Sequence, residues 1–220
     1  MKQLLILVLL FATVITVFTG CGSSSSGPSP TSTPASTPTS TPASTPAPSP
    51  VVVTYYCDID GIVFSSGIVN SDGTQMSVGD NSSDVAMQSL VSFPLPLPAG
   101  ATIQKATLRL YEFSNSNAHL TGNLLLEHLY VNFGAIDGKY FAGTPSGLTS
   151  CGEFSSLVIG WNEIDVTSSV QEDYTATRGK SQFRLYRTTL TDSDAEWDYN
   201  GFYTSENGTN KPELVITYTL

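Results

Sequence analysis

Short runs rich in Val, Ile, Tyr, Phe and Thr alternate with turn-forming clusters throughout residues 51–220. The clusters NSDG, GDNSSD, SNSN and SENGTN are typical of connections between strands, and helix signals are scarce. One short helix is expected within 167–179, capped by Thr167 or Ser168. Many short strands with few helices predict an all-β sandwich or barrel. The clearest strands are predicted at 101–113, 123–133, 157–167, 181–190 and 213–220.

A Ser/Thr/Pro-rich segment precedes this region and contains no charged or large apolar residue. Pro34, Pro38, Pro42 and Pro46 are spaced four apart, which favours extended polyproline II conformation over a packed core. Residues 21–50 are therefore predicted to be a disordered linker. Because no second linker or internal repeat interrupts the remainder, residues 51–220 are predicted to form one domain.

The first twenty residues have the pattern of an export signal. Lys2 is followed by the apolar run LLILVLLFATVITVF, which is short for a membrane span and suits a signal peptide. The following FTGC resembles the lipobox of bacterial lipoproteins, which implies cleavage after residue 20 and lipidation of Cys21. The expected location is the extracellular face of the cell envelope, with the chain attached to a membrane through its lipid. An ordinary secretory signal with an incidental cysteine is the alternative.

Charge and cysteine content narrow the possible partners. The chain has 9 basic and 19 acidic residues, a net charge of −10, which argues against nucleic acid or an anionic membrane surface as a general partner. Cys57 and Cys151 remain in the domain, with no CxxC pair or Cys/His cluster. In an exported domain they are expected to form a disulfide, and two buried free thiols are the alternative.

Three segments, 91–113, 160–186 and 201–220, together resemble the DNRLRE domains of bacterial and archaeal surface proteins. Those domains are related to disaggregatase repeats and to an alginate-binding carbohydrate module. The matching elements are the turn LPAGATI, the strand end WNEIDVT and the closing strand KPELVITY. The resemblance implies a jelly-roll-like antiparallel β-sandwich that serves as an accessory binder instead of a catalyst.

Sequence motifs of the common hydrolases are missing. The chain has no GxSxG, no HExxH and no Gly-rich phosphate loop, and neither His119 nor His128 adjoins an evident nucleophile. The protein is therefore not expected to be an enzyme. A carboxylate pair could still support a polysaccharide lyase or glycosidase, because sequence spacing does not reveal such a pair.

The segment TDSDAEWDYN at 191–200 places acidic residues at every second position. On a regular strand these like charges would share one face and repel, so a loop is predicted. Jelly-roll binding modules often hold a structural Ca²⁺ with loop carboxylates, whereas Trp197 occupies the turn-glycine position and excludes an EF-hand. A solvated acidic loop is the alternative, and catalytic carboxylates are the third. The candidate metal ligands are Asp192, Asp194, Glu196 and Asp198.

Aromatic residues are the second source of candidate binding groups. Trp161 is flanked by Val158, Ile159 and Ile164, so it is expected in the core. Trp197 lies among acidic residues and is the better candidate for an exposed ring that stacks on sugar, with an inward anchor as the alternative. Phe202 and Tyr203 are expected to divide between core and surface by strand alternation.

A pattern of one basic residue and one tyrosine recurs in LRLYEF, EHLYVNF and FRLYRT. Alternation would place these side chains opposite the apolar ones, on a solvent-facing surface. Tyrosines stack on pyranose rings and guanidinium groups pair with uronate carboxylates, so one groove could bind an anionic polysaccharide. Ordinary solvent-facing strand residues are the alternative. The candidates are Arg109, Tyr111, His128, Tyr130, Arg184 and Tyr186.

The leading hypothesis is a lipid-anchored, surface-displayed carbohydrate-binding module for an acidic, uronate-type polysaccharide of the envelope or its surroundings. The alternative is a structural or adhesive surface protein that packs against protein neighbours and binds no sugar. A polysaccharide-degrading enzyme ranks third.

Overall fold

The computed structural model describes residues 47–116, 122–142, 148–154 and 156–220. The predicted signal peptide, Cys21 and the linker up to residue 46 lie outside the described residues. No helix among the described residues is both long enough and apolar enough to cross a membrane.

The described chain is built mainly from antiparallel strands, which confirms the predicted all-β class. It contains two short helices, α1 (Lys139–Ala142) and α2 (Thr167–Thr175). The strands are β1 (Val51–Tyr56), β2 (Ile59–Phe64), β3 (Val69–Asn70), β4 (Gln75–Asp80), β5 (Ala86–Pro94), β6 (Thr102–Ser116), β7 (Leu124–Leu129), β8 (Leu148–Glu153), β9 (Gly160–Asp165), β10 (Lys180–Arg187), β11 (Asp198–Tyr203) and β12 (Glu213–Thr219).

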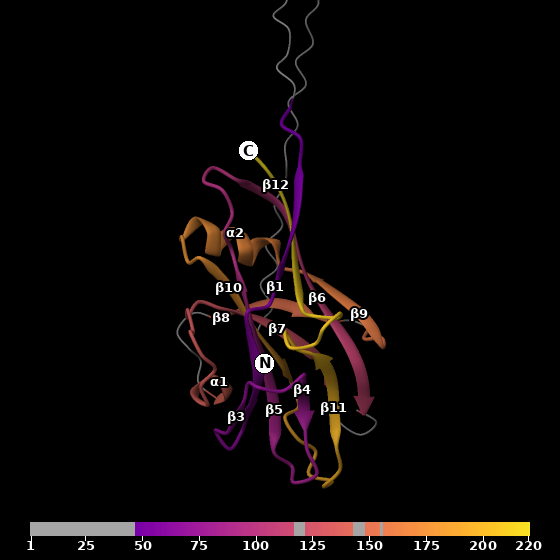
Figure 1. The fold of residues 1–220 in the computed structure, drawn as a ribbon. Helices are drawn as coiled ribbons and strands as arrows, with labels where there is room; N and C mark the ends of the chain where they lie inside the picture. The colour runs from indigo at the N-terminus through magenta and orange to yellow at the C-terminus, as the bar shows by residue number, and fades with distance from the viewer. Residues whose placement is uncertain (1–46, 117–121, 143–147, 155) are drawn as a thin grey trace, which may run out of the picture. The chain divides into compact units, whose positions relative to one another are not determined.

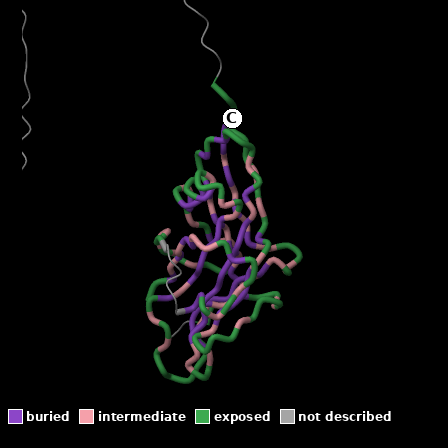
Figure 2. The backbone as a smooth tube through the Cα atoms, turned by 90° about the vertical axis from the view of Figure 1, so that its left-hand side faces the viewer, coloured by how far each residue is buried: buried purple, intermediate pink, exposed green. Residues whose placement is uncertain are grey.

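The strands form one continuous sheet in the order β1-β12-β6-β11-β4-β5-β10-β7-β8, with β9 on β6 and β2 on β5. The sheet curls so that its two halves face each other across the core (Figure 1). We call β1, β12, β6, β9, β11 and β4 the first layer, and β2, β5, β10, β7 and β8 the second. Figure 2 shows the buried stretches running along the inside of this curl, while the loops are mostly exposed.

The core lies between the two layers. Strand β6 alternates along much of its length, with Leu108 and Leu110 fully buried, and Arg109 and Tyr111 half-buried on the opposite face. Strand β10 contributes Phe183 and Leu185 to the same core cluster. Phe202 is buried and Tyr203 is half-buried, as the alternation predicts.

A second, smaller core covers the other side of the second layer. Leu90 and Leu129, on β5 and β7, pack there against Phe133, Tyr140 and Phe141 from the segment that contains α1. Strands covered on both faces carry apolar residues on both faces, so their outward side cannot be recognised from alternation.

Helix α2 forms within the predicted segment, but the predicted cap is wrong. The N-cap position is Val166, which makes no side-chain capping bond. Asp165 Oδ1 accepts the Thr167 backbone N–H at 2.8 Å, while Thr167 Oγ1 accepts the Ala106 backbone N–H at 2.9 Å. The Thr167 hydroxyl therefore attaches the helix to β6 instead of capping it.

The expected disulfide is not formed, because Cys57 and Cys151 are both free thiols. The Cys57 thiol donates to the Ile59 carbonyl at 3.2 Å, at the start of β2. Cys151 is on β8, where its thiol lies 3.3 Å from the Ser169 hydroxyl of α2. Each thiol has its own partner, and burial raises the pKa of both.

Candidate functional site

The predicted basic and tyrosine residues do not form one groove. Arg109 and Tyr111 lie on the outer face of the first layer, whereas Arg184 and Tyr186 lie on the outer face of the second. Their inward neighbours on β6 and β10 pack against each other in the same core, so the two outer faces point in opposite directions. Strands β6 and β10 are also separated in the sheet by β11, β4 and β5.

His128 is not on an outer face at all. Its side chain is 0 % exposed, and its Nε2 lies 2.8 Å from Asp173 Oδ2 of α2. His128 pairs with Phe183 across β7 and β10, and the two rings are 5.6 Å apart. The residue therefore joins α2 to the inner face of the second layer and cannot contact a sugar from solvent.

Tyr130 belongs to the same region as His128, not to the tyrosines on β6. Its hydroxyl lies 2.5 Å from the Thr149 hydroxyl, and the Arg178 guanidinium lies 4.5 Å from the centre of its ring. Tyr130 therefore makes its contacts with Thr149 and Arg178 and does not lie in one groove with Tyr111.

Arg184 is a buried structural residue, so the prediction that it lies on a solvent-facing binding surface is wrong. Its guanidinium bonds to Glu127 Oε2 at 2.5 and 3.0 Å and donates to the carbonyls of Tyr140 and Phe141. The second core covers it, which leaves 7 % of the residue exposed. Tyr186 lies beside it, with the guanidinium 5.6 Å from the ring centre.

The outer face of the first layer instead carries a line of five rings, which we call the aromatic strip. Tyr111 meets Trp161 edge to face at 5.4 Å and stacks on Tyr203 at 5.6 Å. Tyr203 also stacks on Phe113 at 4.8 Å. Trp161, expected in the core, is therefore on this outer face. The strip consists of Trp161 on β9, Tyr111 and Phe113 on β6, and Tyr203 and Tyr199 on β11.

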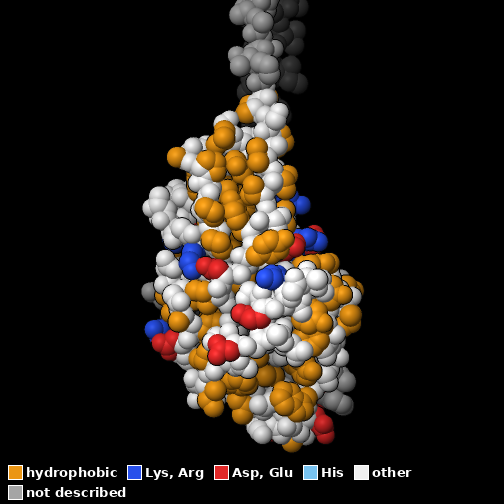
Figure 3. Space-filling view, viewed as in Figure 1, with side chains coloured by type: hydrophobic (Ala, Val, Ile, Leu, Met, Phe, Trp, Pro, Cys, Tyr) orange, Lys and Arg blue, Asp and Glu red, His pale blue; other side chains and the backbone are white. Residues whose placement is uncertain are grey.

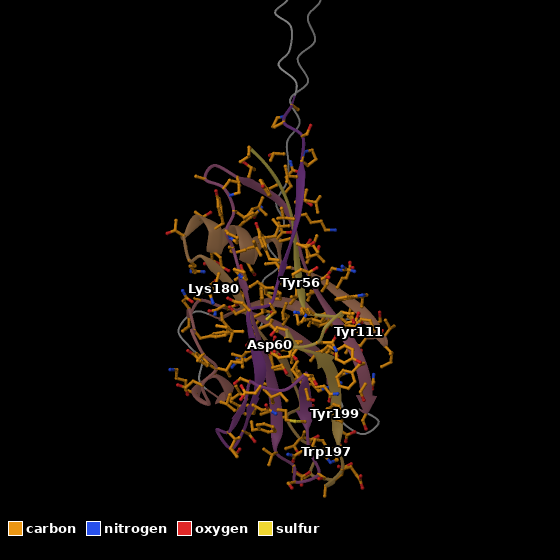
Figure 4. All side chains as sticks on the ribbon, in the orientation of Figure 1. Tyr56, Asp60, Tyr111, Lys180, Trp197 and Tyr199 are labelled. Atoms are coloured by element: carbon orange, nitrogen blue, oxygen red, sulfur yellow. The ribbon has the colours of Figure 1, made fainter. Side chains whose placement is uncertain are left out.

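Gly201 allows the strip to continue along β11. A Cβ carbon at this position would come within 2.8 Å of the Phe113 ring and 3.2 Å of the Tyr199 ring. The two rings thus lie directly over the glycine backbone. Tyr199 then meets Trp197 at 6.0 Å in an edge-to-face contact. Figure 4 shows Tyr111, Tyr199 and Trp197 following one another toward the end of the domain.

Trp197 is 50 % exposed and forms one wall of an open groove of about 350 Å³, which we call the Trp197 groove. The groove adjoins the strip, because Gln75 and Ser77 of β4 pair with Tyr203 and Gly201 of β11. Figure 3 shows hydrophobic side chains exposed on this part of the domain. Amide and hydroxyl groups lie among the apolar ones in the groove lining, which includes Phe64, Asn70, Thr74, Gln75, Ser77 and Trp197.

A buried polar network lies on the inner side of the strip. Asn200 Nδ2 donates to Glu112 Oε1 at 2.7 Å, and Arg187 donates to Asn200 Oδ1. Glu112 and Asn200 are both 0 % exposed. Burial raises the pKa of Glu112 and lowers that of Arg187, so each charge depends on its neighbours for stabilisation. The network fixes β6, β11 and β10 to one another below the rings.

The charge around the strip is negative. The Arg109 guanidinium lies 4.6 Å from the centre of the Trp161 ring, but it pairs with Glu163 at 2.8 Å and Glu213 at 2.5 Å. One cation therefore faces two carboxylates at the Trp161 end. At the opposite end, Trp197 lies within the acidic loop, between Glu196 and Asp198.

Three of the four predicted metal ligands converge. Carboxylate oxygens of Asp192, Asp194 and Asp198 all lie within 4.8 Å of one another. Glu196 is outside this group, and its backbone N–H donates to Asp194 Oδ1 at 2.8 Å. Burial raises the pKa of the neighbouring Asp80, and the charges of Asp192 and Asp198 raise it further.

Sequence reasoning did not single out Phe113, Tyr199, Tyr203, Gln75 or Ser77 as binding candidates. A usable signal was present on β11, where Tyr199, Gly201 and Tyr203 alternate with the buried Asn200 and Phe202. Its significance depends on β6, which brings Tyr111 and Phe113 alongside from far away in the chain. Pairing over such a separation cannot be obtained from a local pattern.

Residues 70–218 match the family model for carbohydrate-binding module family 96. No curated protein matches the chain. The matched residues include the aromatic strip, the acidic loop and most of the Trp197 groove.

Proposed function

Because the chain belongs to carbohydrate-binding module family 96, we propose that its polysaccharide-binding site is the aromatic strip together with the Trp197 groove. Membership of this family makes the protein a carbohydrate-binding module, which is a binding domain and not a catalytic one.

The main support for placing the glycan site here is the exposure of Trp197. Sugar rings present C–H groups on their faces and hydroxyls around their edges, so a binding surface needs an apolar ring beside hydrogen-bonding groups. Trp197 has half of its surface in solvent, and the Gln75 amide and Ser77 hydroxyl line the groove next to it. The strip extends this surface along the face, which suits a chain of several sugar units.

The glycan class has two candidates. The first is the acidic, uronate-type polysaccharide predicted from the sequence, and its support is the Arg109 guanidinium beside Trp161 at one end of the strip. The second is a neutral polysaccharide, which is favoured by the ion pairs that Arg109 makes with Glu163 and Glu213. An anionic chain would have to displace these carboxylates or bind away from them.

A glycan array followed by competition distinguishes the two candidates. A uronate polymer that binds through Arg109 should bind more weakly as salt rises, because salt screens exposed charge pairs. Arg109→Gln should then weaken uronate binding and leave neutral glycans unaffected. Binding of a neutral glycan without salt dependence, together with no binding of uronate polymers, would exclude the uronate candidate. Absence of binding to any glycan would favour a structural or adhesive surface protein.

The proposed location in the cell rests on the sequence of the first fifty residues. FTGC supports lipidation at Cys21, and the Ser/Thr/Pro-rich linker would hold the binding domain away from the membrane. Cys21→Ser should release the protein from membranes or leave it unprocessed, while the melting temperature of the domain stays unchanged. Lipidated, membrane-bound Cys21→Ser protein would contradict this proposal.

A further inference from the structure

Four aspartates meet where β4 ends and β11 begins. Asp80 is the last residue of β4, and it pairs directly with Asp198, the first residue of β11. The preceding loop adds Asp192 and Asp194, whose oxygens lie within 4.8 Å of each other and of Asp198. Like charges opposite each other on paired strands are destabilising, so this arrangement needs a compensating interaction.

Asp80 supplies an observation that is independent of the exposed loop. The residue is 1 % exposed, and neither of its carboxylate oxygens accepts a hydrogen bond of ordinary geometry, although the Thr191 side chain and the Asp192 backbone both lie close enough to lower its pKa. Buried polar groups are nearly always hydrogen-bonded, and a buried carboxylate is paired or binds a metal. The charges of Asp192 and Asp198 both act on Asp80, which places its carboxylate next to the cluster.

Among the described residues, acidic groups outnumber the cations that interact with this cluster. Arg187 is the cation whose charge interacts with Asp80 and Asp198, and it also interacts with Glu112. Its guanidinium donates to the Gly122 carbonyl and to Asn200. One positive charge thus serves a region that also contains Asp192 and Asp194, so the region has a large excess of negative charge.

We propose that Asp80, Asp192, Asp194 and Asp198 bind one Ca²⁺ ion, with Asp80 as the buried ligand. Calcium takes six to eight oxygen ligands at about 2.3–2.6 Å, so ligands on opposite sides of the ion are separated by about 5 Å. The oxygen separations among Asp192, Asp194 and Asp198 fit this value, and Asp80 adjoins this group through its pairing with Asp198. Asp192 and Asp194 are exposed, which gives the ion a path from solvent, and water can complete the coordination.

The ion would connect three parts of the domain: the end of β4, the start of β11 and the loop that carries Trp197. Asp84 already holds this loop, because its Oδ1 accepts the Ala195 backbone N–H at 3.1 Å. The binding of calcium does not require any sugar, so the calcium site and the proposed glycan site can be tested independently.

Calcium titration of the full-length protein in detergent, stripped beforehand with EGTA, tests the site. Calorimetry with CaCl₂ should give one ion per chain, and the melting temperature should rise with calcium and fall again with EGTA, because a ligand of the native state stabilises it. Absence of both heat and a melting shift would overturn the proposal.

Two variants and one control locate the ion. Removing a residue that only supports a metal ligand typically lowers metal affinity about tenfold or more. Removing a ligand itself should have at least this effect, so Asp80→Asn and Asp194→Asn should each weaken calcium binding about tenfold or more. Asp194 is exposed, so its variant tests the site even if Asp80→Asn disturbs folding. Glu196→Gln removes a charge from the same loop and should leave the affinity unchanged. Equal weakening by Glu196→Gln would overturn the proposal, because it would indicate general attraction to an acidic surface.

Discussion

Gly201 lies directly beneath Phe113, so close that a Cβ carbon on the glycine would be 2.8 Å from the aromatic ring. The same carbon would be 3.2 Å from the Tyr199 ring. Because the glycine is fully covered by these rings, its lack of a side chain determines how near the two halves of the aromatic strip approach each other. This contact leads to the first prediction.

Gly201→Ala should weaken glycan binding more than it changes stability. The added methyl group must displace the end of the Phe113 ring, which then shifts against Tyr203. Alanine also reduces the conformational entropy of the unfolded chain, which offsets part of the strain. Calorimetric titration with glycan and a melting curve on the same sample measure both effects. Gly208→Ala, where a Cβ carbon would meet no atom within 4 Å, is the matched control.

Leu110 and Tyr111 are neighbours on β6 and should behave oppositely. Leu110 is fully buried between the layers, so Leu110→Ala should lower the free energy of unfolding by about 2–5 kcal/mol through loss of apolar burial and a cavity. Tyr111 is half-buried on the outer face, so Tyr111→Ala should cost less stability and more glycan affinity. Denaturant unfolding and glycan titration of both variants measure the two effects. Equal effects on both properties would contradict the assignment of the two faces.

Stability should increase as the pH falls from neutral toward the carboxyl range, in part because of Asp60. This side chain is buried, with Oδ2 accepting the Ser205 backbone N–H at 2.7 Å and Oδ1 without a hydrogen-bond partner. Burial raises the pKa of Asp60 above its ordinary value. The native chain then binds a proton more tightly than the unfolded chain, so a rise in pH through this range lowers the free energy of unfolding.

Asp60→Asn tests this dependence, because asparagine keeps an acceptor for Ser205 and carries no charge. The variant should be more stable than wild type at pH 7, and its free energy of unfolding should vary less between neutral pH and the unfolded carboxyl pKa of about 4. Denaturant titrations across this range measure the slope. The exposed Asp72→Asn controls for the change in net charge, and an unchanged slope in Asp60→Asn would refute the assignment.

The sequence predicted the fold class because strand alternation and turn clusters are local signals. Leu108, Leu110, Phe183 and Leu185 were placed on inward faces correctly for this reason. Alternation does not reveal which strands pair or which layer they join. Arg109 and Arg184 therefore shared a predicted groove, although the fold places them on opposite outer faces.

The errors at His128 and Trp161 have a common cause. His128 was assigned outward because Leu129 was assumed to face the core, but Leu129 packs in the second core on the other side of β7. Trp161 was assigned to the core because Val158 and Ile159 precede it, yet both of these are more than half exposed. In both cases the direction of a side chain was inferred from apolar neighbours that do not face the core between the two layers.

The acidic loop was predicted in part. The alternation of Asp192, Asp194 and Asp198 is visible in the sequence, and the structure brings their oxygens together. Asp80 could not be associated with them in this way, because it lies beside Asp198 only through the pairing of β4 with β11. The buried partner of an exposed motif is thus decided by sheet topology.

The most direct test of the proposed binding site is the glycan affinity of Trp197→Ala measured against that of Tyr56→Ala. Both rings are about half exposed, but Tyr56 is on β1, where it pairs with Glu213, and Figure 4 places it well apart from Trp197. With the glycan identified on the array, Trp197→Ala should lose about 1–3 kcal/mol of binding free energy by calorimetry, as aromatic anchors do at interfaces. Tyr56→Ala should bind like wild type, and both variants should keep the wild-type melting temperature. Wild-type affinity in Trp197→Ala, or an equal loss in Tyr56→Ala, would contradict the assignment of the site to Trp197 and its groove.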